Sequence, residues 1–158
     1  MPDFATTVEL DVDAYIPPSY IVNEQQKLDI YKRIAGVETA AEGDDMQEEL
    51  LDRFGEVPVC VTNLIRIALI RVCAHMLYIT ELKGKPGQIR FIFRPDARVH
   101  GENIPQLLMR HGDKLKFSAK GIPEFTYTYK RNGLVEKDAA QLLELTETVL
   151  ADMRQLLL

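Results

Sequence analysis

Apolar residues recur every three to four positions in the first half of the chain, and this spacing predicts three helices. The first follows Asn23, which with Gln26 resembles a capping box, and ends at Gly36. The second spans residues 44–54 and stops at Gly55, and a longer helix begins at Pro58. The predicted inward-facing positions are Leu28, Tyr31, Ile34 and Ala35 in the first helix, Met46, Leu50, Leu51 and Phe54 in the second, and Val61, Leu64, Ile65, Ala68, Leu69, Val72 and Met76 in the third.

The apolar period changes to two after residue 77, which predicts strands over 77–82 and 88–94, with Gly84 and Gly87 at the turn between them. A β-hairpin is expected around Gly121-Ile122-Pro123. In it, Leu115 and Phe117 would pair with Phe125, Tyr127 and Tyr129.

Three further elements complete the predicted fold. Residues 8–12 alternate apolar and acidic side chains, as a short strand does. A short helix follows Pro105 and is closed by Gly112. Asn132-Gly133 breaks the last strand, and Asp138 with Gln141 caps a final amphipathic helix that carries Leu142, Leu143, Val149, Leu150, Met153, Leu156 and Leu157.

This order predicts an α+β fold, because strict alternation of strands and helices is missing. We expect a helical N-terminal half, then an antiparallel sheet of about four strands with interrupting and C-terminal helices. The 158 residues and 46% hydrophobic content suit a single domain over 1–158, with 1–7 as a linker. The sequence shows neither a secretory signal nor an apolar run of about 20 residues, so we expect a cytoplasmic protein without a membrane contact.

Charge is distributed unevenly along the chain, whose net charge is −5. Residues 1–56 hold 14 acidic and four basic side chains, whereas residues 83–131 hold 11 basic and four acidic ones. Such asymmetry guides association with charged partners, although two separately solvated faces would give the same distribution.

The sequence contains none of the common motifs of catalysis or cofactor binding. There is no phosphate-binding glycine loop, no dinucleotide-binding turn, no paired-cysteine motif and no serine in a nucleophile elbow. His75, His100 and His111 lack the spacing of metal ligands. We therefore expect no catalytic residues, no cofactor and no metal site in this chain.

A nucleic-acid-binding module is the alternative interpretation, because residues 83–131 interleave Lys and Arg with Phe and Tyr. Strand alternation argues against it. The aromatic side chains fall on one face of each strand and the charges on the other, as expected for core residues beneath a basic surface. DNA binding that weakens steeply with salt would support the alternative.

Residues 48–55 form the most informative stretch of the sequence. On a helix, Glu48, Glu49, Asp52 and Arg53 span one polar arc, and Glu49 precedes Arg53 by four residues, the favourable orientation for an ion pair. At a surface such a pair contributes only about 0.3–0.5 kcal/mol, so stability is a weak reason for the arrangement.

Several segments resemble the C-terminal domain of the bacterial transcription-repair coupling factors, the Mfd family. They are Asp13-Ala14-Tyr15-Ile16-Pro17, Tyr20-Ile21, residues 26–35, and Glu49-Leu50-Leu51-Asp52-Arg53-Phe54-Gly55-Glu56-Val57-Pro58. The resemblance is strong over about residues 8–75 and looser from there to Leu158.

The resemblance implies a non-catalytic, autoinhibitory domain at the end of an ATP-driven DNA translocase. In that family the domain packs on a UvrB-like module and covers the surface that UvrA must reach, until RNA polymerase is engaged in excision repair. ATP and magnesium belong to the translocase domains, and RNA polymerase and DNA are contacted through other domains. The family motif Glu-Leu-x-Asp-Arg-Phe-Gly implies interdomain contacts at Glu49, Asp52 and Arg53.

Overall fold

The computed structural model describes residues 4–129 and 137–157, which divide into two compact units. The helical unit comprises residues 12–72. The sheet unit comprises the described residues up to Asp11 and from Cys73 onward, so that the division falls within one helix. The expectation of a single domain stays a prediction.

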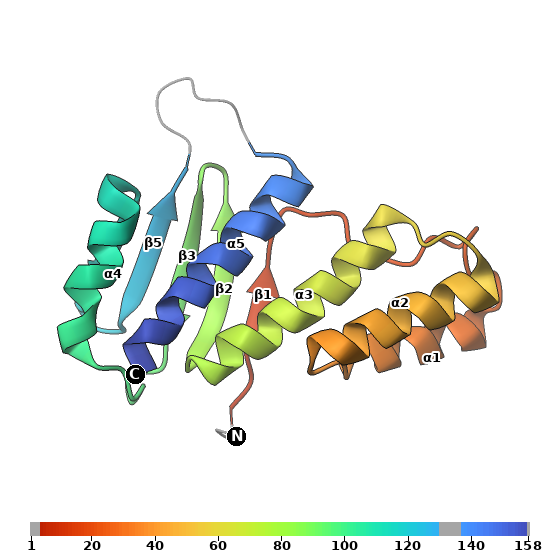
Figure 1. Cartoon of the computed structure of the whole chain (residues 1–158), viewed down its shortest axis with the longest axis horizontal. Coiled ribbons are helices and arrows are strands. Elements are labelled where there is room, and N and C mark those ends of the chain that lie inside the picture. The colour runs from red at the N-terminus through yellow and green to blue at the C-terminus, as the bar shows by residue number, and fades with distance from the viewer. Residues whose placement is uncertain (1–3, 130–136, 158) are drawn as a thin grey trace. The chain divides into compact units, whose positions relative to one another are not determined.

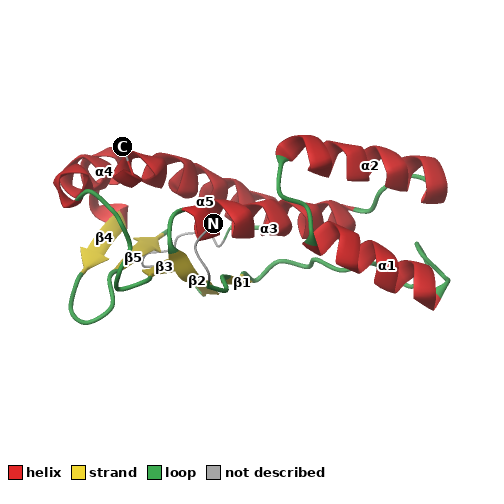
Figure 2. Ribbon diagram, turned by 90° about the horizontal axis from the view of Figure 1, so that it is seen from below, coloured by secondary structure: helices red, strands yellow, loops and turns green. Residues whose placement is uncertain are grey.

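The helical unit contains α1 (Glu24–Ala35), α2 (Ala40–Phe54) and most of α3 (Val59–Met76). Figures 1 and 2 show α1 and α2 running side by side. The predicted boundaries of α1 are confirmed, since the Asn23 side chain accepts a hydrogen bond from the Gln26 N–H and Gly36 ends the helix. The buried cluster that joins the helices comprises Ile16, Ile21, Ile30, Ile34, Met46, Leu50, Val61, Ile65 and Ala68.

Helix α2 begins four residues earlier than the sequence predicted, because Thr39 caps it by accepting a hydrogen bond from the Glu42 N–H at 3.1 Å. Gly43 lies within the helix rather than before it. A Cβ added at Gly43 would lie 3.3 Å from Leu69 Cδ1 and 3.4 Å from Ile65 Cγ2. Glycine therefore permits a close approach of α2 to α3.

Four residues predicted to face inward are exposed, namely Leu28, Ala35, Leu51 and Met76. In α1 the buried stripe instead includes Ile30, and in α2 it runs through Gly43, Met46 and Leu50. Helical spacing alone does not distinguish the buried face of a helix from a face one residue away. Which residues are buried depends on where the neighbouring helices pack.

The sheet unit contains one five-stranded sheet in the described residues, ordered β1-β2-β3-β5-β4. The strands are β1 (Thr7–Glu9), β2 (Ile79–Lys85), β3 (Gln88–Phe93), β4 (Leu115–Ser118) and β5 (Glu124–Thr128). Four of them form the expected antiparallel arrangement, with Leu115 opposite Tyr127 and Phe117 opposite Phe125. The sheet is mixed, however, because β1 pairs with β2 in parallel.

Strands β1, β2 and β3 have other bounds than the sequence predicted, since β1 spans Thr7–Glu9 rather than residues 8–12 and β3 ends at Phe93 rather than at residue 94. Strand β2 starts at Ile79 rather than Leu77, because Leu77 and Tyr78 lie in the turn that ends α3, where Tyr78 has a φ of 65°. Gly84 lies inside β2, and the turn before β3 contains Gly87. The predicted break at Asn132-Gly133 lies outside the described residues.

Helices α4 (Ile104–His111) and α5 (Ala139–Met153) lie on one face of the sheet (Figure 2). The other sheet face has no described helix of this unit over it. Gly112 closes α4, and α5 begins with the predicted capping box of Asp138 and Gln141. The core beneath these helices comprises Leu82, Ile89, Phe91, Phe93, Leu107, Leu115, Phe125, Leu142, Leu143, Val149, Leu150, Met153 and Leu156.

Residues 4–7, which were expected to belong to a linker, make specific contacts in the sheet unit. The Phe4 ring stacks on His75 with centroids 4.2 Å apart, and the Arg94 guanidinium lies 4.8 Å from the centre of the same ring. The Thr6 hydroxyl donates to the Ile79 carbonyl at 2.7 Å. These contacts lead the chain directly into β1.

Among the described helices, α3 is the one long and apolar enough, by length and composition alone, to cross a membrane. Its mean hydropathy is 1.5 over 18 residues, and a third of this stretch is buried. Core helices have the same composition, and Val61, Ile65 and Ala68 of α3 belong to the buried cluster of the helical unit.

We expect Gly43→Leu to lower the free energy of unfolding by about 1–3 kcal/mol, because the new side chain must displace Leu69 and Ile65. Leucine has a higher helix propensity than glycine, so a net loss of stability would come from crowding against Leu69 and Ile65. Denaturant unfolding measures the change, with Ala41→Leu on the exposed face of α2 as the matched control. Equal or greater stability for Gly43→Leu would show that α2 and α3 are not in close contact there.

Candidate functional site

The C-terminal end of α2 is held by contacts to Tyr20 in the segment before α1. The Tyr20 hydroxyl lies 3.1 Å from the Leu50 carbonyl oxygen and 2.9 Å from that of Gly55, and both oxygens can accept its proton. The Tyr20 ring also packs on Phe54 with centroids 5.9 Å apart. Gly55 has a φ of 89°, a backbone conformation that favours glycine, and ends the helix. This end of α2 is therefore a defined structure rather than a frayed terminus.

Glu49 on α2 receives hydrogen bonds from two arginine side chains. The Arg33 guanidinium on α1 donates to both carboxylate oxygens at 2.5 and 2.6 Å, and Arg53 on α2 donates at 2.8 Å. The Arg53 guanidinium also lies 4.9 Å from the centre of the Phe54 ring. The ion pair predicted between Glu49 and Arg53 is confirmed, and Arg33 extends it to a second helix.

The two arginines hold the pKa of Glu49 well below its usual range. Hydrogen bonds from Arg33 and then Arg53 lower it from 4.5 to about 2. The Glu49 side chain nevertheless remains 32% exposed. It is thus a permanently charged carboxylate at neutral pH, orientated by its neighbours and still accessible to solvent.

Glu48 and Asp52 continue the acidic surface along the outward face of α2. Both are exposed, and neither side chain makes a hydrogen bond or ion pair among the described residues. With Glu49 and Arg53 they form the polar arc that the sequence predicted, here called the α2 arc. Leu51 lies beside this arc with 58% of its surface exposed, so that the predicted inward orientation is wrong.

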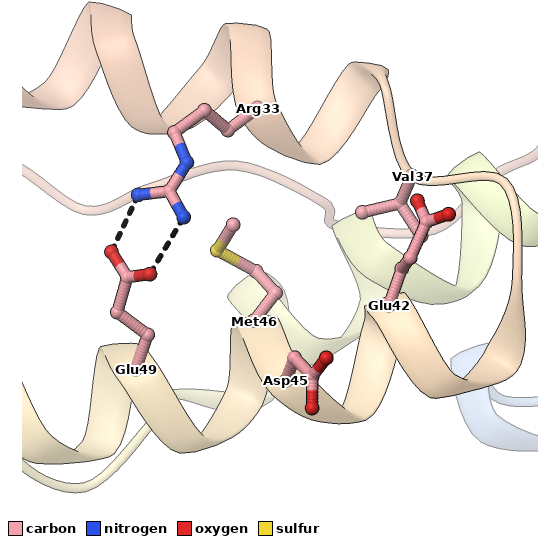
Figure 3. A pocket seen from close by; sticks show the side chains of 6 residues that line it. All are labelled: Arg33, Val37, Glu42, Asp45, Met46 and Glu49. Atoms are coloured by element: carbon pink, nitrogen blue, oxygen red, sulfur yellow. Dashed lines mark hydrogen bonds and ion pairs between the residues drawn. The ribbon is translucent and has the colours of Figure 1, made fainter.

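An open pocket of about 300 Å³ adjoins the α2 arc between α1 and α2. Figure 3 shows Met46 rising from α2 toward α1, between the Arg33–Glu49 pair on one side and Val37 and Glu42 on the other. The six residues that line the pocket are Arg33, Val37, Glu42, Asp45, Met46 and Glu49. Three of the six are acidic, and one is basic.

The basic segment of the sequence, residues 83–131, contributes to the sheet unit. Its aromatic side chains Phe91, Phe93, Phe125 and Tyr127 are buried, as strand alternation predicted. Arg90 is paired with Glu124 at 2.6 Å, and Lys83 lies 3.8 Å from Glu81. These contacts leave neither stacking surfaces nor free cations at those positions for a nucleic acid.

A second cluster of titratable side chains lies in the sheet unit, between α4 and α5. His111 and Arg110 on α4 both contact Asp152 on α5, at 2.8 and 2.9 Å, and so join two helices. The described residues contain no group of three or more His, Cys, Asp or Glu side chains placed to hold a metal ion.

Arg33 and the pocket are the parts of this site that sequence reasoning missed. Arg33 is 16 residues from Glu49, so no local spacing rule connects them. The short connection between α1 and α2 could have predicted this contact. Gly36 ends α1 and Thr39 caps α2, and so short a turn makes neighbouring helices pack antiparallel.

Comparisons with known proteins identify the domain that the sequence resembles. A model of the TRCF domain family matches residues 10–104. The transcription-repair-coupling factor of Bacillus subtilis (strain 168) is 31% identical over 120 residues, which cover 75% of this chain and 10% of that protein. The factor of Staphylococcus aureus (strain USA300) is 45% identical over 97 residues, covering 60% and 8%.

A crystal structure of the C-terminal domain of a transcription-repair coupling factor superposes with a TM-score of 0.82. It is 24% identical in sequence, and the match covers 97% of this chain and 94% of that one. The fold is therefore that of an α+β transcription-repair coupling factor C-terminal domain. From the family match, the chain belongs to the TRCF domain family. It spans about a tenth of the length of the curated relatives it matches.

We predict that Arg33→Met raises the pKa of Glu49 from about 2 to a value between 2 and 4.5, because the largest stabilising contact is lost while Arg53 remains. Carboxyl-detected NMR titration measures this directly. Lys32→Met removes the neighbouring exposed charge and should leave the pKa of Glu49 near its wild-type value. An unchanged pKa in Arg33→Met would mean that Arg33 does not hold Glu49 in solution.

The same pairs should make the stability of the fold depend on pH only on the acid side. The pKa of Glu49 is lower in the folded protein than in the unfolded chain, so its contribution is present above pH 4.5 and is lost as the pH falls toward 2. We expect this contribution to stay below about 1 kcal/mol, because the pairs are partly solvated. The acid-side decline in unfolding free energy should be shallower in Arg33→Met than in the wild type.

Tyr20→Phe should destabilise the helical unit by about 0.5–1.5 kcal/mol, because carbonyl oxygens of Leu50 and Gly55 lose their donor while the ring contact with Phe54 is kept. Denaturant unfolding measures the loss. Tyr15→Phe, at a half-exposed tyrosine whose hydroxyl makes no hydrogen bond in the described structure, is the control. Equal effects of the two substitutions would show that the Tyr20 hydroxyl does not hold the end of α2.

Proposed function

We propose that this chain is a non-catalytic docking domain that inhibits a transcription-repair coupling factor from within the same protein. The domain packs on the factor's UvrB-like module and masks the surface that UvrA binds. Engagement of RNA polymerase separates the two domains and exposes that surface for excision repair.

Family membership and the short span of the chain support this proposal. The chain matches about a tenth of each relative, and we assign any motor activity of the parent protein to the remaining length. Under the proposal, ATP and magnesium act in those other domains, as do contacts with polymerase and DNA. The same proposal places the parent protein in the cytoplasm.

The observation that carries the proposal is the preorganised charge on α2. Glu49 and Arg53 are held in one geometry by Arg33, Phe54 and each other, so that little side-chain freedom remains to be lost on docking. Preorganised charged groups favour specific association with a complementary partner.

The three proposed contact residues have different roles. Asp52 is exposed and unpaired in the described structure, which makes it the direct contact for a cation on the partner. Glu49 already accepts three hydrogen bonds, and a carboxylate can accept about four, so one position remains for a partner donor. Arg53 still has donors free for a partner acceptor.

A competition mechanism follows if the docking partner lies in the same polypeptide. A tethered module experiences an effective concentration on the order of millimolar, so even a weak contact keeps the surface covered. Opening then requires only that polymerase binding favours the separated arrangement. The interface can therefore be modest and still inhibit UvrA binding.

Isothermal titration calorimetry of this domain against the isolated UvrB-like module tests the proposal. We expect Asp52→Lys to weaken binding at least tenfold, because the substitution places a cation opposite a basic surface. Glu49→Ala should also weaken it, since Arg53 and Arg33 lose their common partner.

The matched control is Glu144→Lys, which makes the same change of charge at an exposed position on α5. It should bind as the wild type does. Circular dichroism should show that all variants remain folded. Wild-type affinity in Asp52→Lys, or no binding by the wild-type domain, would contradict the proposal.

A further inference from the structure

We propose that the pocket between α1 and α2 receives a single arginine side chain of the docking partner. This inference rests on the proposed docking function and adds a site that shares only Glu49 with the motif at residues 49–55. The partner is the UvrB-like module, and the arginine is its anchor in the helical unit.

The shape of the pocket suits a long side chain with an apolar stem. Its inner surface is formed by Met46 and Val37, which are buried, and its volume is about 300 Å³. Figure 3 shows Glu42 and Asp45 on the α2 side and Arg33 with Glu49 at one end. An arginine stem can cover the apolar surface while its charged group stays at the polar rim.

The charges of the pocket leave room for one more cation. Glu42, Asp45 and Glu49 bring three negative charges, and Arg33 brings one positive charge that is already used by Glu49. Glu42 accepts a hydrogen bond from the Glu38 N–H at 3.2 Å, which leaves its other acceptor positions free. Asp45 is exposed and unpaired among the described residues.

Arginine fits these acceptors better than lysine does. Glu42 and Asp45 are three residues apart on α2 and therefore lie on the same side of the helix. A planar guanidinium can donate to two carboxylates at once, whereas an ammonium acts as a point charge. The Arg33–Glu49 pair already shows a bidentate contact at one end of the same pocket.

The pocket is continuous with the α2 arc, because Glu49 belongs to both. A partner whose basic surface faces Asp52 would thus present the neighbouring pocket with cationic side chains as well. Insertion of one of them would give the interface a defined register, which solvated charge pairs alone do not supply.

The first arm of the test uses methylguanidinium as a probe and needs no protein partner. In ¹H–¹⁵N spectra of the wild-type domain, we expect millimolar probe to shift the amides of residues 42, 45, 46 and 49 in a saturable way. Asp45→Asn should reduce the shifts at least threefold. Asp44→Asn makes the same charge change at an exposed position outside the pocket and should leave them unchanged.

The second arm measures binding to the UvrB-like module by calorimetry. We expect Asp45→Asn to weaken docking about tenfold and Asp44→Asn less than twofold. Arginines on the module's basic surface are replaced one at a time. We expect one of these replacements to abolish the effect of Asp45→Asn, so that the double variant binds no more weakly than the arginine variant alone. That coupling, measured as a double-mutant cycle, would identify the inserted side chain.

The outcomes separate the two proposals. If the module binds the wild type but Asp45→Asn and Asp44→Asn bind equally, the pocket inference is overturned and the docking function stands. If the module does not bind the wild type, the docking function fails, and with it the partner assigned here. Absence of saturable shifts with methylguanidinium overturns the pocket as a guanidinium site in either case.

Discussion

The contact between Arg33 and Glu49 joins α1 to α2 at the surface, above a buried apolar cluster that joins them inside. Its stabilising energy is small because the pair is partly solvated. Its structural effect is larger. It places the Glu49 carboxylate where Arg53 also reaches it, and Arg53 in turn lies over Phe54, which packs on Tyr20. One short series of contacts thereby sets the geometry of Glu49 and Arg53 in the α2 arc.

The buried residues of α2 make that arrangement possible. Gly43 lets the helix approach α3 closely, and Met46 and Leu50 are buried in the same cluster. With one side of α2 so tightly held, the opposite side must face solvent, and there the sequence supplies Glu48, Asp52 and the exposed Leu51. The α2 arc and the buried cluster thus occupy different faces of a single helix, so that a substitution in the arc need not disturb the packing.

Local sequence signals predicted the helix ends well. Asn23 with Gln26, Gly36, Gly55, Gly112 and Asp138 with Gln141 act at the predicted positions, because capping depends on residues only a few positions apart. The start of α2 was missed since Gly43-Asp44-Asp45 favours a turn locally, whereas the close approach to α3 favours glycine in the helix. Parallel pairing of the three-residue strand β1 also leaves no local signal.

The candidate site shows the same division between local and distant contacts. The Glu49–Arg53 pair follows from a spacing of four residues, but Arg33 and the pocket depend on how α1 and α2 pack. The wrong orientation predicted for Leu51 has the same origin, because an apolar residue beside a buried stripe is assigned inward unless the neighbouring helices are known.

We propose that docking of this domain excludes UvrA from the UvrB-like module. A competition experiment measures this exclusion: labelled UvrB-like module bound to UvrA is titrated with this domain, and the fraction bound to UvrA is followed by fluorescence anisotropy. We expect the domain to displace UvrA, and the apparent affinity of the module for the domain to fall in proportion to the UvrA concentration. A ternary complex, with the affinity for UvrA unchanged at saturating domain, would show that docking does not mask the UvrA-binding surface.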